Sequence, residues 1–101
     1  MQTHDTANFA SREIRLPVHS GLTLRETARL VQEANRYHCD IHIKACGRVA
    51  NAKSILGVAS LPLSRALSLE AEAWGEDSEA CLESLARILE EDLTADRAFD
   101  A

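Results

Sequence analysis

Apolar and polar residues alternate in four segments of the sequence, a pattern typical of β-strands that bury one face. The four segments cover residues 12–18, 39–45, 48–52 and 67–73. Pro17 favours an outer position for the first strand, because proline cannot donate a ladder hydrogen bond. Cys46-Gly47 separates the two middle segments, and such a short connection predicts a tight hairpin turn.

Two longer segments repeat apolar residues every three or four positions, which predicts two amphipathic helices. The first runs from Thr23 to about Arg36. Thr23 and Glu26 have the T-x-x-E spacing of a capping box, in which each side chain bonds the other residue's main-chain N–H. The predicted buried side of this helix consists of Leu24, Ala28, Leu30, Val31 and Ala34. The second helix runs from about Ser78 to Leu93.

A short apolar helix is predicted after Ser54, with Gly57 near its end. The order of elements is therefore β-α-β-β-α-β-α, and the fold class is α+β. Both long helices pack most economically on one face of a four-stranded antiparallel sheet, which leaves the other face open to water. We predict one domain over residues 11–93, between a mobile arm over 1–10 and a mobile tail over 94–101.

Composition excludes several function classes. The chain has 101 residues and a net charge of −5, which argues against nucleic acid or an anionic membrane surface as a partner. It has no apolar run of the roughly 18 residues that a membrane helix needs, and its start does not resemble a signal peptide. Its 3 cysteines have no paired spacing, which suits a reducing compartment. We therefore expect a cytoplasmic protein.

Ser54 stands between a predicted strand and the short helix, so it is a good N-cap. The apolar residues Ile55, Leu56 and Val58 follow it directly, and one short helix cannot bury all of them. An exposed apolar patch beside a modifiable hydroxyl is typical of a docking site. The alternative is an ordinary helix cap followed by core residues, and the local pattern alone leaves both open.

Two motifs resemble those of HPr, the histidine-containing phosphocarrier of the bacterial sugar phosphotransferase system. The stretch Lys53-Ser54-Ile55-Leu56-Gly57-Val58-Ala59-Ser60-Leu61 closely resembles the regulatory-serine segment of that family. The stretch Ser20-Gly21-Leu22-Thr23-Leu24-Arg25-Glu26-Thr27-Ala28 resembles in part its signature Asn-Gly-Leu-His-Thr-Arg-Pro-Ala-Ala. The register between them needs no gap, and the resemblance covers about residues 11–93. It implies the open-faced β-sandwich of HPr, in agreement with the pattern above.

The resemblance places Thr23 at the position of the phosphoryl-accepting histidine, Arg25 at that of the family's arginine, and Glu26 at that of its proline. A threonine hydroxyl is a weak nucleophile without a base, and its phosphoester is too stable to pass on. The carboxylate of Glu26 occupies the positive potential that a phosphate would use. We therefore expect Thr23 and Glu26 to be a helix cap and not a carrier site. His19, in the preceding loop, is the other candidate acceptor, but it lacks the helix end.

The second motif implies a regulatory serine at Ser54, which an HPr kinase/phosphorylase would phosphorylate, so that the product binds a transcriptional or metabolic regulator. Lys53 and Arg48 would supply positive charge nearby. The predicted partner-binding residues are Arg25, Lys53, Ser54, Ile55, Leu56 and Val58. We expect a non-enzymatic regulatory protein without a cofactor, as in the family's catabolite-repression HPr. The alternatives are a working phosphocarrier with another acceptor, which would contact phosphotransferase enzymes, and a binding module without phosphorylation.

Two further features carry less weight. Cys39-x-x-His42 with Cys46 has the residue types of a zinc site, but Cys39 and His42 point to opposite faces of an alternating strand, so we expect no metal site. Trp74, near the end of the fourth strand, is either an exposed anchor or a packed ring.

Overall fold

A computed structural model describes residues 8–16 and 21–92 of the chain. The predicted order of elements is confirmed: β1 (Phe9–Arg15), α2 (Leu24–Ala34), β2 (Asp40–Ala45), β3 (Arg48–Asn51), α3 (Ile55–Ala59), the 3-10 turn η1 (Leu63–Arg65), β4 (Ser68–Trp74), α4 (Ser78–Arg87) and the π-helical turn η2 (Ile88–Asp92). The strands form one antiparallel sheet in the order β1-β4-β2-β3. The fold is α+β, as expected.

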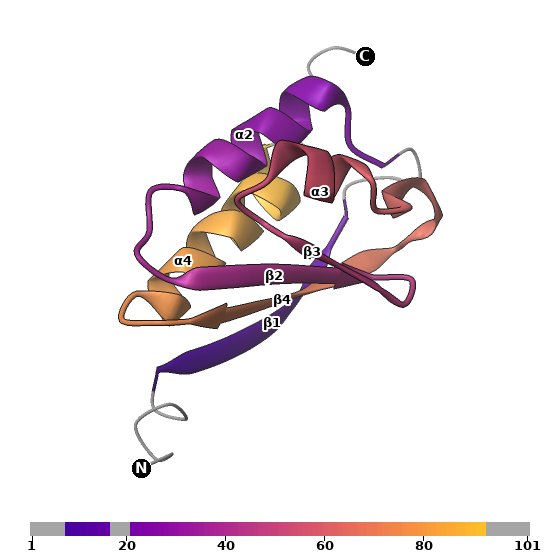
Figure 1. Cartoon of the computed structure of the whole chain (residues 1–101). Coiled ribbons are helices and arrows are strands. Elements are labelled where there is room, and N and C mark those ends of the chain that lie inside the picture. The colour runs from indigo at the N-terminus through magenta and orange to yellow at the C-terminus, as the bar shows by residue number, and fades with distance from the viewer. Residues whose placement is uncertain (1–7, 17–20, 93–101) are drawn as a thin grey trace.

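Helices α2 and α4 lie side by side on one face of the sheet (Figure 1). Alternate strand residues bury their side chains beneath them, and the cross-strand pairs Ile14–Leu69 and Ile43–Ala71 are almost fully buried. The helices contribute Leu30 and other apolar residues of their inner sides to the same core. Burial of these side chains is the main force that holds the two layers together.

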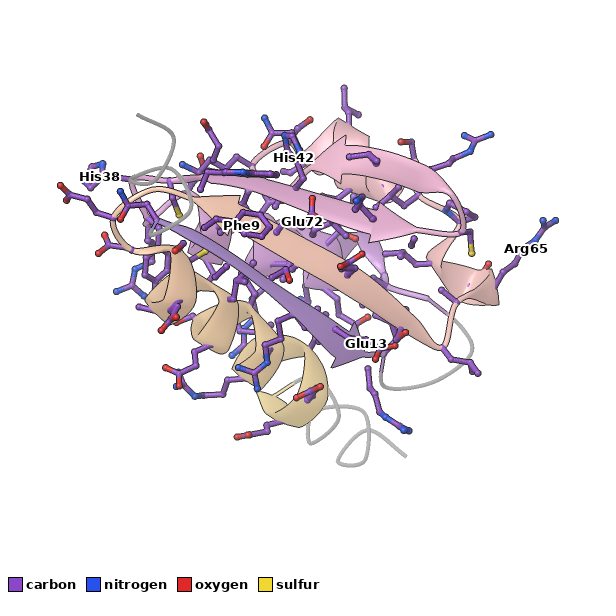
Figure 2. All side chains as sticks on the ribbon, turned by 90° about the horizontal axis from the view of Figure 1, so that it is seen from below. Phe9, Glu13, His38, His42, Arg65 and Glu72 are labelled. Atoms are coloured by element: carbon purple, nitrogen blue, oxygen red, sulfur yellow. The ribbon has the colours of Figure 1, made fainter. Side chains whose placement is uncertain are left out.

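The opposite face of the sheet is open to solvent (Figure 2). The ring of Trp74 packs there between Phe9, at 5.2 Å between ring centroids, and His42, at 5.0 Å. Beside them Lys44 forms an ion pair of 3.3 Å with Glu72. Trp74 is therefore a half-buried packed ring, which decides between the two alternatives left open by the sequence.

Two turns depend on unusual backbone angles. Cys46 and Gly47 both have positive φ, 52° and 78°, which matches the twist of a two-residue hairpin. Gly75 has φ 138°, and a Cβ there would lie 2.6 Å from the Cβ of Cys39. Only glycine fits between β4 and α4 at this point.

Several expectations were wrong in detail. Strand β1 begins at Phe9, so Phe9 and Ala10 belong to the sheet and not to the arm predicted over 1–10. Leu24, expected on the buried side of α2, is 71% exposed, because the capping box brings Glu26 and Thr27 to the inner side of the first turn. Gly57 lies inside α3 and does not end it. Pro17, Val18 and the predicted tail over 94–101 lie outside the described residues.

Among the described residues, no helix is long and apolar enough to cross a membrane.

Candidate functional site

Thr23 is the N-cap of α2, as its sequence spacing predicts. Its backbone is extended, with φ −69° and ψ 169°. Its Oγ1 accepts a hydrogen bond of 3.1 Å from the N–H of Glu26, and Glu26 Oε1 accepts one of 2.9 Å from the N–H of Thr23. The capping box is therefore complete, and two N–H groups of the helix start are already bonded within the chain.

Glu26 is only 9% exposed, although it is charged. Its carboxylate bonds the N–H of Thr23 at the helix start and compensates the positive end of the helix dipole. Arg25 points its charge into solvent on the same turn, with Leu24 beside it. The predicted stand-in acceptor, His19, lies outside the described residues.

The start of α2 packs against the end of α3. Gly21 has φ 74°, and a Cβ on it would come within 2.9 Å of the main-chain N of Ser64. A small cavity of about 160 Å³ lies at this junction, and Leu22, Thr27 and Val58 are among its lining residues. The two candidate sites, at Thr23 and at Ser54, are therefore carried by elements that touch.

Ser54 is the N-cap of α3. Its Oγ accepts a hydrogen bond of 3.0 Å from the N–H of Gly57, and its main-chain oxygen accepts the bond of the first helical turn from Val58. The side chain is half-buried. A Cβ on Gly57 would lie 3.3 Å from this Oγ, so glycine at this position leaves the hydroxyl more room than alanine would.

The apolar residues after Ser54 divide into two groups. Leu56 is 84% exposed and Ile55 is 41% exposed. Val58, which we expected in the same patch, is fully buried and belongs to the core. Leu56 and Val58 are two positions apart and therefore lie on different sides of α3, and the side that carries Val58 belongs to the core. The exposed apolar patch is therefore Ile55 and Leu56, and Leu24 is a further exposed leucine that the periodicity of α2 did not single out.

The side chain of Lys53 reaches the end of α2. Its Nζ donates a hydrogen bond of 2.7 Å to the main-chain oxygen of Tyr37, just past the end of α2. Its own main-chain oxygen accepts a bond of 3.2 Å from Asn35 Nδ2. A cation at a helix C-terminus is favourable, so this contact of Lys53 stabilises the packing of the segment before α3 against the end of α2. Arg48, the other predicted cation, is exposed in β3.

Cys39 and His42 lie on opposite faces of the sheet, as the alternation of the sequence predicts. Cys39 is buried and His42 lies on the open face against Trp74. Cys39 instead lies near Cys81 of α4, and both thiols are buried. Burial raises the pKa of the Cys81 thiol to about 12, and burial also raises the pKa of Cys39. Within residues 8–16 and 21–92, no three His, Cys, Asp or Glu side chains are grouped to hold a metal ion.

The comparisons with known proteins agree with this geometry. The family model described as "PTS HPr component phosphorylation site" matches residues 10–91. The chain is 37% identical over 85 residues to the HPr-like protein Crh of Bacillus subtilis (strain 168), which covers 84% of this chain and all of that protein. It is 35% identical over 80 residues to the phosphocarrier protein HPr of Buchnera aphidicola subsp. Schizaphis graminum, which covers 79% of this chain and 94% of that protein.

Solved structures give the same result. The phosphocarrier protein HPr from Bacillus anthracis str. Ames superposes with a TM-score of 0.74 at 37% identity, over 80% of this chain and 96% of that one. A crystal structure of Crh from Bacillus subtilis gives a TM-score of 0.65 at 38% identity, over 79% of this chain and 92% of that one.

The fold thus defines a small α+β protein with an open-faced β-sandwich, and the proteins that it resembles are phosphocarrier and HPr-like proteins. The chain belongs to the HPr family, which confirms the resemblance seen in its two motifs.

Proposed function

We propose that this protein is a regulatory member of the HPr family that does not carry phosphate at Thr23 and acts through Ser54, Ile55 and Leu56. The complete Thr23–Glu26 capping box is the observation that carries the proposal. It bonds the N–H groups of Thr23 and Glu26 within the chain and places a carboxylate at the positive end of the helix, which opposes a phosphate there. The similarity to the HPr-like protein Crh, the catabolite repression HPr of Bacillus subtilis, supports the same role.

The chemistry at Thr23 explains why transfer through this residue would fail. An onward carrier needs a phosphoryl group bound to a good leaving group, and a phosphoimidazole supplies this whereas a threonine phosphoester does not. Both hydrogen bonds of the capping box go to main-chain N–H groups, and neither of them joins the hydroxyl of Thr23 to the carboxylate as a nucleophile–base pair. Phosphate arriving there would meet the nearby carboxylate and be repelled.

Ser54 is a better acceptor for a kinase-driven reaction. Its Oγ accepts from Gly57, and its own proton is not needed for that bond. A kinase would move the phosphoryl group of a nucleotide or pyrophosphate donor to this Oγ while its own base takes the hydroxyl proton. The product adds about two negative charges at pH 7 next to Leu56, which is 84% exposed. A regulator could therefore recognise phosphate and an apolar contact together, and the fold need not change.

The partners in this proposal are an HPr kinase/phosphorylase and a transcriptional or metabolic regulator. The protein would be a substrate and a ligand of these partners and not an enzyme. Arg25 and Leu24, both exposed at the start of α2, could extend the contact surface toward the Thr23 end.

Two phosphorylation assays test the proposal. In the first, the protein is incubated with an HPr kinase and ATP, and its mass is measured for wild type, Ser54→Ala and, as a matched control, Ser60→Ala. We expect one added phosphate on wild type and on Ser60→Ala, and none on Ser54→Ala. No phosphate on wild type, under conditions that modify an ordinary HPr, would favour a binding module without phosphorylation.

The second assay uses the upstream phosphotransferase enzyme and phosphoenolpyruvate. We expect no acid-labile phosphate on the protein, while an ordinary HPr in the same tube is labelled. Acid-labile phosphate on this chain would instead identify a working phosphocarrier, and His19→Ala would then show whether that loop histidine is the acceptor.

A further inference from the structure

A groove between α2 and α4 gathers positive charge on an otherwise acidic protein. It has a volume of about 430 Å³, within the range of small-molecule sites. Its lining includes Arg29 and Arg36 from the α2 side and Arg87 from α4. With Glu33, the fourth charged residue in the lining, the groove has a net charge of +2. Because the whole chain has −5, the rest of it has −7.

The spacing of these residues explains why they meet. The spacing of three and four positions places Arg29, Gln32 and Glu33 along one side of α2, and Arg36 follows in the turn after the helix. Ser84, Arg87 and Ile88 repeat the pattern on α4. From Arg29 to Ala34, the last residue of α2, the helix rises about 7.5 Å, and Arg36 lies two residues farther along the chain. Arg29 and Arg36 therefore enter the lining at different points along the chain, and Arg87 enters it from α4.

Polar partners in the groove are already oriented. Glu33 accepts a hydrogen bond of 3.3 Å from Arg36, and the hydroxyls of Tyr37 and Ser84 lie 2.6 Å apart. When Tyr37 donates in this pair, the Ser84 proton remains available for a ligand oxygen. Ile88, which is 6% exposed, contributes an apolar part of the lining.

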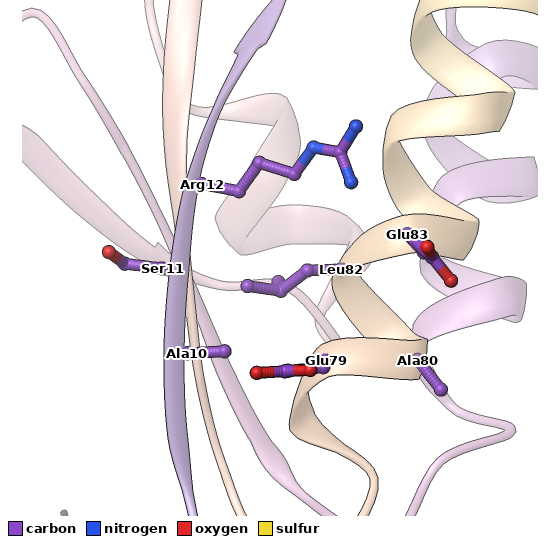
Figure 3. A pocket seen from close by; sticks show the side chains of 7 residues that line it. All are labelled: Ala10, Ser11, Arg12, Glu79, Ala80, Leu82 and Glu83. Carbon is purple, nitrogen blue, oxygen red and sulfur yellow. The ribbon is translucent and has the colours of Figure 1, made fainter.

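The larger hollow on the molecule has a different character. It has a volume of about 680 Å³ and lies between β1 and α4, where Arg12 extends toward the helix that carries Glu79 and Glu83 (Figure 3). Opposite charges line that hollow, so it does not select one sign of ligand. The α2–α4 groove does, because arginine outnumbers glutamate there three to one.

We propose that the α2–α4 groove binds a small anion that carries two or more phosphate groups. Arginine donates planar, paired hydrogen bonds that match phosphate oxygens, and three arginines at separate points suit a ligand with charge at both ends. The groove lies on the helix layer and is distinct from Thr23 and Ser54. Whether it binds phosphate groups is therefore independent of the regulatory proposal.

The test uses inorganic tripolyphosphate as the probe and the full chain labelled with ¹⁵N. We expect saturable shifts of the Gln32 side-chain amide and of the Ser84 main-chain N–H. Arg36→Gln combined with Arg87→Gln should weaken binding at least tenfold. Arg65→Gln, which removes an exposed arginine of η1 outside the groove, should leave it within twofold of wild type.

A second variant tests the sign of the effect. Glu33→Gln removes the negative charge of the groove and keeps the shape of the side chain, so it should tighten binding. A parallel titration with citrate distinguishes phosphate from carboxylate chemistry, and equal affinity for citrate would overturn the assignment to phosphate. Shifts without saturation, shifts centred on other residues, or equal losses in Arg65→Gln and the double variant would overturn the site itself.

Discussion

Thr23 and Glu26 bond each other at the start of α2: each side chain accepts the main-chain N–H of the other, at 3.1 and 2.9 Å. Thr23 is the residue that would have to react, and Glu26 is the one that would have to make room for the phosphate. The capping box joins the two. This relationship predicts that a carrier site cannot be restored by one substitution.

We predict that Thr23→His alone accepts little phosphate from the phosphotransferase enzyme, and that Thr23→His with Glu26→Pro accepts it at least about tenfold faster. The second change removes a carboxylate from the helix start, and about 1.4 kcal/mol of electrostatic relief corresponds to that factor. Proline is tolerated in the first helical turn. The measurement is the initial rate of labelling from phosphoenolpyruvate. Equal rates for the two variants would show that Glu26 does not oppose phosphate.

The same capping box contributes to stability. Thr23→Ala should lower the free energy of unfolding by about 1 kcal/mol, because it leaves the N–H of Glu26 without its side-chain partner. Thr23→Ser keeps the hydroxyl and should cost much less. Urea unfolding of the three proteins checks the prediction, and it would be contradicted by an alanine variant as stable as the serine variant.

Much of this arrangement could be predicted from the sequence because it depends on short-range patterns. The T-x-x-E spacing of Thr23 and Glu26 predicts the capping box, and alternation predicts the four strands. Cys46-Gly47 predicts the hairpin, since few residues other than glycine adopt positive φ easily.

The missed features depend on how elements pack. Leu24 and Val58 look equally apolar in the sequence, yet Leu24 is 71% exposed and Val58 is fully buried. The direction of Lys53, toward the carbonyl of Tyr37, required the end of α2 to be placed beside α3. The arginine groove similarly joins residues from two helices that are far apart in the chain.

Leu56 and Val58 form a natural pair for separating binding from stability. Leu56→Ser removes an exposed side chain, so it should change the free energy of unfolding by less than about 0.5 kcal/mol and weaken binding of a regulator to the Ser54-phosphorylated protein. Val58→Ala creates a small cavity in the core and should cost about 1–3 kcal/mol. Urea unfolding together with titration of the phosphorylated protein measures both. Unchanged regulator affinity in Leu56→Ser would remove Leu56 from the docking surface.

Lys53 should matter for stability more than for phosphorylation. Lys53→Met keeps most of the side-chain volume but removes the 2.7 Å bond to the Tyr37 carbonyl, and we expect a loss of about 1–2 kcal/mol. Arg48→Met, which removes an exposed charge from β3, is the matched control and should be nearly neutral. Thermal or urea unfolding compares the two. If Lys53→Met were as stable as Arg48→Met, the bond to Tyr37 would contribute nothing net.

The buried thiols predict a loss of stability at alkaline pH. Burial raises the pKa of Cys81 to about 12 in the folded protein, above its ordinary value of 9.0, and also raises the pKa of Cys39. Well below pH 9.0 the thiols keep their protons in both the folded and the unfolded protein, so they cause no pH dependence of stability there. As pH rises from 9 toward 12 the unfolded chain releases protons that the folded chain keeps, so the free energy of unfolding falls, by at most about 1.4 kcal/mol per pH unit for each thiol.

Urea unfolding between pH 7.5 and 10.5 measures this slope. Cys81→Ala should be less stable at pH 7.5, because it leaves a cavity, but its stability should fall less steeply with pH than that of wild type. Cys46→Ala removes an exposed thiol instead and should keep the wild-type slope. Apart from the replaced cysteine, the three proteins share all their ionisable groups, so only the difference between the slopes reports the buried thiol. Parallel curves for wild type and Cys81→Ala would mean that the thiol of Cys81 loses its proton as easily in the folded protein as in the unfolded chain.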